Sequence, residues 1–192
     1  MRITTFAFPL IFAPLVATAQ IGNPTFMAPD TQFDRSGMPA AKQPNSSDKL
    51  FAMLAAEGGL AEVNFAQLAN SRAQSDSVKD FSQQMLKDHA DANSTLAALA
   101  RDRGIVVPDA LNSEQAAVRT QLESQRGTAF DLTYMRAQVV EHQKTVQLLL
   151  WELGNGQDAE VQQFAAQTLP VIMRHLDLAK QLSAELAYAI DR

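Results

Sequence analysis

The chain contains no cysteine among its 192 residues. It therefore has neither a disulfide framework nor a cysteine that could carry a lipid behind a signal sequence. A single domain of this length buries enough surface to be stable without covalent cross-links. We expect one domain that is stabilised by packing alone.

Long apolar runs and clusters of basic residues are also missing. Beyond residue 19 no segment reaches the ~18 consecutive apolar residues of a membrane-spanning helix. The chain has 16 lysines and arginines against 21 aspartates and glutamates, a formal net charge of −5. Such a surface repels a phosphate backbone. The composition predicts no transmembrane span and no nucleic-acid partner.

Residues 1–19 have the features of a secretory signal peptide. Arg2 supplies a positive charge, an apolar run follows, and residues 17–19 (Ala-Thr-Ala) form a small-x-small cleavage site. The run is too short to span a bilayer, and Pro9 and Pro14 interrupt it. We expect cleavage near Ala19 and a periplasmic or secreted product, with a retained N-terminal anchor as the alternative. Loss of Arg2 leaves 15 basic against 21 acidic residues, a formal charge of −6.

Composition divides the rest of the chain into two parts. Residues 20–47 contain four of the eight prolines, with polar residues between them, and this stretch predicts a flexible linker. Residues 48–190 contain two prolines and are rich in alanine, leucine and glutamine, which is helical composition. The second part is the expected helical domain.

Apolar residues spaced by threes and fours predict four long helices in this domain and no strand. The expected spans are about 48–73, 76–104, 128–154 and 158–190, and a shorter helix at about 113–125 lies in the connection between the second and third. Ser47 and Asp48 are the expected N-cap of the first helix, and Thr128 with Asp131 a capping box for the third. Near the end of the third helix, Leu153 is predicted to point inward.

The connections predict how these helices are joined. The segment of 104–127 is long enough to travel the length of a helix pair at ~1.5 Å per helical residue, whereas the other two connections are short. We therefore predict an all-α, ferritin-like four-helix bundle with a long crossover that contains the extra short helix. A simple up-down-up-down bundle is the alternative.

The chain has three histidines, and each falls on the inward stripe of a different long helix: His89, His142 and His175. The remaining helix has Glu62 on its inward stripe. Counting from the helix ends places all four within about 5 Å of one level. Buried polar groups are costly unless they satisfy one another or a cation. We predict either one metal ion bound by Glu62 and the three histidines, or a hydrogen-bonded layer without metal.

Such a ligand set suits zinc, iron, manganese or copper, and the sequence does not choose among them. Asp88 and Glu141 each precede a histidine and lie about 100° round the helix, where a carboxylate can orient an imidazole of a neighbouring helix. Pairing with lysines or solvent is the alternative for both. Met85 and Met135 share the histidine stripes and would suit copper, although methionines at helical spacing are usually core residues.

The chain also resembles a family of exported bacterial proteins, the domain of unknown function 4142 family, sometimes labelled outer-membrane proteins. The resemblance covers roughly residues 50–182. It rests on Gly58-Gly59-Leu60-Ala61-Glu62, Met85 with Asp88-His89, Gly127 with Phe130-Asp131 and Tyr134, His142, and Leu169-Pro170 with His175-Leu176.

The resemblance implies a ferritin-like four-helix bundle in the cell envelope, and it implies no established activity. Di-iron ferritin-like proteins carry Glu-x-x-His on two helices. This chain instead has Leu86, Val139 and Ile172 three residues before its histidines. The pattern therefore argues against ferroxidase or iron-storage chemistry.

Three classes of function remain. The first is a metal-binding bundle, a carrier or single-metal redox protein with an envelope or stress role. The second is a non-catalytic structural or protein-interaction module of the periplasm that binds an envelope partner. An enzyme is the third and weakest, because the chain shows no nucleophile elbow, phosphate-binding loop or His-Glu-x-x-His motif.

The signal-peptide prediction has a direct test in the intact mass of exported protein. We expect a mature chain that begins at Gln20, because residues 17–19 form the cleavage site. A mature mass that still includes residues 1–19 would contradict this prediction.

Overall fold

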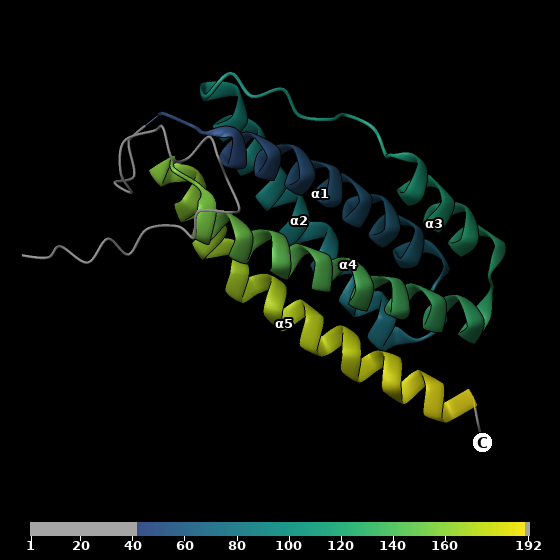
Figure 1. Ribbon diagram of the computed structural model, residues 1–192. Coiled ribbons are helices and arrows are strands. Elements are labelled where there is room, and N and C mark those ends of the chain that lie inside the picture. Colours follow the sequence, from purple (N-terminus) through teal and green to yellow (C-terminus); the bar gives the residue numbers. More distant parts are fainter. Residues whose placement is uncertain (1–41, 191–192) are drawn as a thin grey trace, which may run out of the picture.

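The computed structural model describes residues 42–190, and every regular element in this range is a helix (Figure 1). The prediction of an all-α fold is confirmed for these residues. The predicted signal at 1–19, and the linker up to residue 41, lie outside the described residues. The helices are α1 (Ser46–Arg72), α2 (Asp76–Asp102), α3 (Ser113–Ser124), α4 (Gly127–Asn155) and α5 (Ala159–Ile190).

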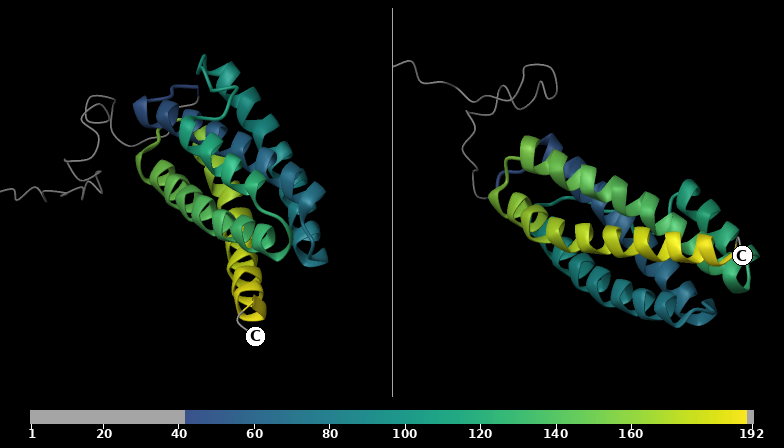
Figure 2. Two further views of the ribbon diagram at one scale, coloured as in Figure 1. Left: turned by 90° about the vertical axis from the view of Figure 1, so that its right-hand side faces the viewer. Right: turned by 90° about the horizontal axis from the view of Figure 1, so that it is seen from below.

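The four long helices pack side by side. Helix α1 packs against α2 and α4, and α5 packs against α4 and α2, so that the four surround one interior (Figures 1 and 2). The short helix α3 lies outside them, against α1 and α4. None of the helices among residues 42–190 is long and apolar enough to cross a membrane.

The connection between α2 and α4 runs from one end of the helices to the other (Figure 1). At one end, Arg103 directly after α2 contacts Asp158 directly before α5, with Nε to Oδ2 at 3.2 Å. At the other end, Asp131 in the first turns of α4 contacts the start of α2. Helices α2 and α4 therefore run parallel, and residues 103–126 form the long crossover.

Two helix starts differ from the sequence prediction. The N-cap of α1 is Asn45, whose side chain accepts from Asp48 N while the Asp48 carboxylate accepts from Asn45 N. The prediction of Ser47 and Asp48 as the N-cap was therefore wrong. Asn45 is the N-cap, and Asp48 is the third helical residue, which completes the capping box. The predicted box of Thr128 and Asp131 is also wrong.

Asp131 instead caps a neighbouring helix. Helix α4 begins after Arg126 without a side-chain cap, and the Asp131 carboxylate accepts from Gln74 N at 3.0 Å and Ser75 N at 2.8 Å. These amides stand at the beginning of α2, where free N–H groups favour a negative charge. A tertiary contact has replaced the local one, and it fixes the register of α4 against α2.

A band of polar residues divides the hydrophobic core into two clusters. On α2, α4 and α5 a histidine stands between residues of one cluster and residues of the other. The main buried members of the first cluster are Phe65, Phe81, Met85, Leu122, Phe130, Tyr134 and Met135. Those of the second are Phe51, Leu96, Ile105, Leu149, Val161 and Ile172. The polar layer between them consists of Glu62, His89, Gln138, His142 and His175, all buried.

A second group of buried charges lies where α1 begins and α4 ends. Leu153 was predicted to point inward, but it is 36% exposed, and Glu152 is fully buried in its place. Burial, together with hydrogen bonding to Asp48, raises the pKa of Glu152 to about 9. Asp48 itself accepts from the backbone amides of Gln157 and Asp158. A protonated Glu152 can donate to Asp48, so this acidic pair is stable when it shares one proton.

Truncation of a central side chain in either hydrophobic cluster should destabilise the fold. Phe65 and Leu149 are 0% and 2% exposed. Phe65→Ala or Leu149→Ala should lower the free energy of unfolding by about 2–5 kcal/mol, because each leaves a cavity. Chemical denaturation measures this, with Val140→Ala as the control because Val140 is 48% exposed. A loss below ~1 kcal/mol in both core variants would show that the buried faces are misassigned.

Glu152 predicts a pH dependence of stability. Its pKa is raised from 4.5 to about 9 in the folded state. The folded state therefore holds the proton more tightly, and this stabilisation is complete below about pH 4.5 and declines as the pH rises toward 9. Glu152→Gln removes the titration. From pH 5 to 9 the parent should lose a few kcal/mol relative to this variant, since one pKa unit is about 1.4 kcal/mol.

Denaturant melts across this pH range measure the difference. The control is Glu185→Gln, because Glu185 is an exposed carboxylate on α5. Parallel pH profiles for the parent and Glu152→Gln would refute the assignment.

Candidate metal centre

Three helices bring the chain's three histidines together in the polar layer. His89 comes from α2, His142 from α4 and His175 from α5. The ring centroids are 5.5 Å apart for His89 and His142, 5.7 Å for His89 and His175, and 5.5 Å for His142 and His175. One nitrogen from each ring lies within 4.8 Å of the other two.

The surroundings keep these imidazoles neutral. The side chains are 6%, 1% and 1% exposed for His89, His142 and His175. Burial, together with the two neighbouring histidines, lowers the pKa of His89 to about 3. Burial also lowers the pKa of His142 to about 4 and lowers that of His175. At neutral pH each ring therefore has one nitrogen with a free lone pair, the form that binds metal.

Hydrogen bonds fix which nitrogen carries the proton in two of the rings. Nδ1 of His142 is 2.9 Å from the carbonyl oxygen of Gln138. Nε2 of His175 is 3.0 Å from Oδ2 of Asp88. A carbonyl or carboxylate oxygen only accepts, so both nitrogens donate. The lone pairs are therefore on Nε2 of His142 and Nδ1 of His175.

One further nitrogen in each of the three rings has no hydrogen-bond partner within the protein. Nε2 of His89, Nε2 of His142 and Nδ1 of His175 are buried without a hydrogen bond. Buried polar atoms are normally paired, so three unpaired nitrogens in one cluster form a candidate metal site. A tetrahedral zinc ion with bonds of about 2.0–2.1 Å holds its nitrogens roughly 3.4 Å apart.

Glu62 lies beside this cluster and contacts its outer edge. Its Oε2 accepts from Nε2 of Gln138 at 2.7 Å, and its Oε1 lies 3.7 Å from Nδ1 of His142, the nitrogen that donates to Gln138 O. Burial raises the pKa of Glu62 to about 8 despite the Gln138 hydrogen bond. Glu62 and His142 are therefore both neutral at pH 7, and their contact is not an ion pair. Oε1 has no hydrogen-bond partner.

The two carboxylates predicted to orient imidazoles occupy different environments. Asp88 on α2 accepts from His175 on the neighbouring helix α5, which is the arrangement that carboxylates adopt behind metal-bound histidines. Glu141 instead pairs with Lys144 on its own helix at 3.0 Å. Asp88 also lies 3.7 Å from Nζ of Lys87, so a lysine is near both carboxylates and the contact with an imidazole distinguishes Asp88.

Two polar residues of this region were missed by the sequence analysis. Gln138 and Tyr134 precede His142 by one and two turns, and both side chains are fully buried. The side-chain amide of Gln138 donates to Glu62, and its backbone carbonyl accepts from Nδ1 of His142. In the sequence, the signal for Gln138 was an amide side chain within the otherwise apolar stripe of α4. Met85 and Met135, which suggested copper, lie in the first hydrophobic cluster.

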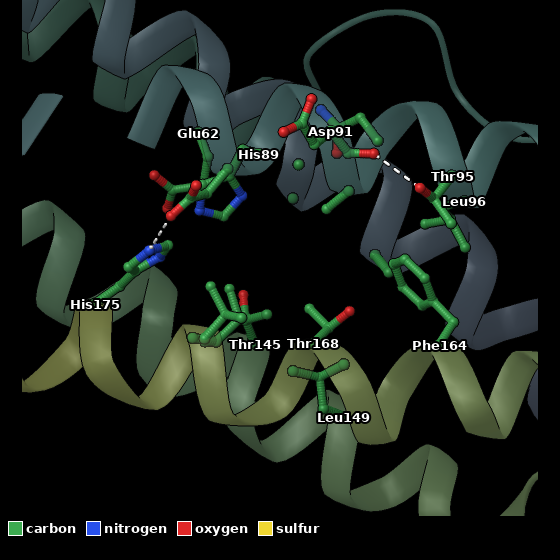
Figure 3. A pocket seen from close by; sticks show the side chains of 18 of the residues that line it. Glu62, His89, Asp91, Thr95, Leu96, Thr145, Leu149, Phe164, Thr168 and His175 are labelled. Carbon is green, nitrogen blue, oxygen red and sulfur yellow. Dashed lines mark hydrogen bonds and ion pairs between the residues drawn. The ribbon is translucent and has the colours of Figure 1, made fainter. Parts of the chain in front are cut away.

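A cavity of about 360 Å³ opens beside the cluster. His89 and His175 line one end of it, and Phe164 and Leu96 line the other (Figure 3). Thr145, Thr168 and Leu149 stand along its side (Figure 3). The histidines thus face a space that a small molecule can enter.

Comparisons with known proteins identify the fold and the family without assigning an activity. No curated protein matches the chain. A crystal structure of a DUF305 fragment from Deinococcus radiodurans is similar to it, with a TM-score of 0.66 and 14% sequence identity over 73% of this chain and 97% of that chain. This likeness shows a shared helical fold alone. The model of the family described as "Domain of unknown function (DUF4142)" matches residues 34–182. The chain therefore belongs to the DUF4142 family.

Proposed function

We propose that the protein binds one metal ion through His89, His142 and His175. The observation that carries the proposal is the group of three buried, neutral imidazoles, each with an unpaired nitrogen, within 4.8 Å of one another. Without an ion, three nitrogens remain desolvated and unsatisfied at a cost of about 1–3 kcal/mol each. A cation satisfies all three at once.

The ligand chemistry narrows the identity of the ion. Three imidazoles suit zinc, copper or ferrous iron, whereas manganese prefers carboxylate oxygens, and none is among these ligands. The two inward methionines pack in the first hydrophobic cluster and add no soft ligand. Three protein ligands leave a coordination position open, as in metal centres that bind an exchangeable group. The proposed centre is therefore one that exchanges a ligand with its surroundings.

In this proposal Asp88 and Glu62 support the imidazoles. Asp88 accepts a hydrogen bond from Nε2–H of His175, and this contact orients Nδ1 of the same ring toward the ion. Glu62 contacts the Nδ1 side of His142, so it steadies that ring from α1 and does not reach the ion. Glu141, paired with Lys144, has no part in the centre.

The wider setting of the proposal is the cell envelope. The signal at residues 1–19 directs export to the periplasm or beyond the cell. The parallel α2 and α4 and the long crossover between them support a ferritin-like four-helix bundle. In that setting the centre serves a carrier or stress role, and no reaction is assigned to it.

A second candidate is an interaction module that binds an envelope protein without metal. It is favoured by large apolar side chains that are exposed on α1 and α4. These are Leu50, Met53, Leu54, Val140, Leu150 and Leu153, each between 36% and 53% exposed. The metal reading accounts for the unpaired histidine nitrogens, whereas an interaction surface leaves them unexplained. We therefore place the metal centre first.

Thermal melts of protein stripped with a chelator test the metal centre. Zinc, manganese, ferrous and cuprous ions are titrated in turn into tag-free parent protein. At least one ion should raise the melting midpoint, because it binds the folded state alone. The rise should shrink as the pH falls toward 4, where imidazoles with pKa values of about 4 and 3 begin to protonate. His89→Ala or His175→Ala should abolish the rise.

A matched pair of carboxylate variants tests whether Asp88 supports the imidazole of His175. Asp88→Asn should weaken metal affinity by about 10–100-fold, as loss of a group that orients a ligand does. Asp91→Asn is the control, because Asp91 is exposed and pairs with Lys87. If no ion stabilises the parent, or the histidine variants respond like the parent, the interaction module becomes the better account.

A further inference from the structure

The cavity beside the histidines is polar at one end and apolar at the other. At the histidine end its lining includes His89, His175 and Glu62 (Figure 3). Toward the opposite end the walls are Leu96, Leu149 and Phe164 (Figure 3). Such a mostly apolar cleft with a few convergent polar groups is typical of a small-molecule site.

Building on the metal centre proposed above, we propose that this cavity binds a medium-chain monocarboxylate. Its carboxylate occupies the open position of the ion held by His89, His142 and His175, and its alkyl chain extends toward Phe164. The cavity thereby makes the centre a receptor for an amphipathic anion.

The charge of the centre selects an anionic head group. Three neutral imidazoles bring no negative charge to a divalent ion, and the Glu62 carboxyl contacts the Nδ1 side of His142, opposite the nitrogen that faces the ion. Asp88, through His175, contributes a single negative charge. A net positive charge in a buried site favours an anion over a neutral donor. The other charged lining residues, Asp91 and Arg174, are exposed and stand at the rim.

The apolar walls select the chain. The volume of about 360 Å³ is too large for a water or an acetate alone. Leucine, isoleucine and phenylalanine side chains line it beyond the histidines, with Thr145 and Thr168 between (Figure 3). Each methylene buried there should strengthen binding about fourfold. Affinity should therefore rise with chain length until the cavity is full.

The test uses the full mature protein loaded with Co²⁺, whose visible spectrum reports on its ligands. Acetate, butyrate and octanoate are titrated separately. Octanoate should change the Co²⁺ spectrum and bind roughly tenfold or more tightly than butyrate, with acetate weakest. By calorimetry, octanoate should bind chelator-stripped protein roughly tenfold or more weakly, because its carboxylate then has no ion to bind.

Variants at the side of the cavity locate the chain. Thr168→Phe and Thr145→Leu fill the space without touching the imidazole nitrogens, so the Co²⁺ spectrum without octanoate should be kept and the gain from chain length lost. Thr120→Phe is the control, because Thr120 is exposed on α3 and does not line the cavity. Retention of the Co²⁺ spectrum also shows that each variant is folded.

The two proposals fail in different ways. A Co²⁺ spectrum in the parent together with equal affinities for acetate and octanoate would overturn the carboxylate site and leave the metal centre standing. Octanoate binding that is unchanged in both cavity variants would overturn it as well. Absence of any Co²⁺ spectrum in the parent would overturn the metal centre, and with it the anchored ligand.

Discussion

The burial of three neutral imidazoles at mid-height is the constraint on which the rest of this structure depends. Each ring is almost fully buried, and desolvation lowers the pKa of all three. The hydrophobic core cannot run continuously through such a layer, and it is divided into one cluster on either side. Part of the interior is therefore occupied by ring nitrogens that have no hydrogen-bond partner within the protein. A bound cation would satisfy them.

Contacts at both ends of the helices keep the histidines at one level. Asp131 of α4 binds the amides of Gln74 and Ser75 before α2, and Asp48 of α1 binds the amides that precede α5. Arg103 ties the end of α2 to Asp158. Because these contacts join different helices, they set the register of each helix against its neighbours. A slip of one turn would move a histidine about 5.4 Å away from the other two.

The sequence predicted the long helices and the candidate site better than the helix ends. Periodicity over 27 to 32 residues is a strong signal, and counting along each helix brought His89, His142 and His175 to one level. It did not show that Asp131 serves α2, or that Glu152 is buried in place of Leu153, because tertiary partners decide both. Nor did it show Gln138 between Glu62 and His142, since spacing alone does not reveal side-chain direction.

The most direct test of the central claim is anomalous X-ray diffraction from crystals of tag-free protein loaded with zinc. The account predicts an anomalous peak at about 2.0–2.1 Å from Nε2 of His89, Nε2 of His142 and Nδ1 of His175. It also predicts that Asp88 still accepts from Nε2 of His175 when the ion is bound. A map without a peak among the three rings, in crystals that hold zinc elsewhere or not at all, would contradict the account.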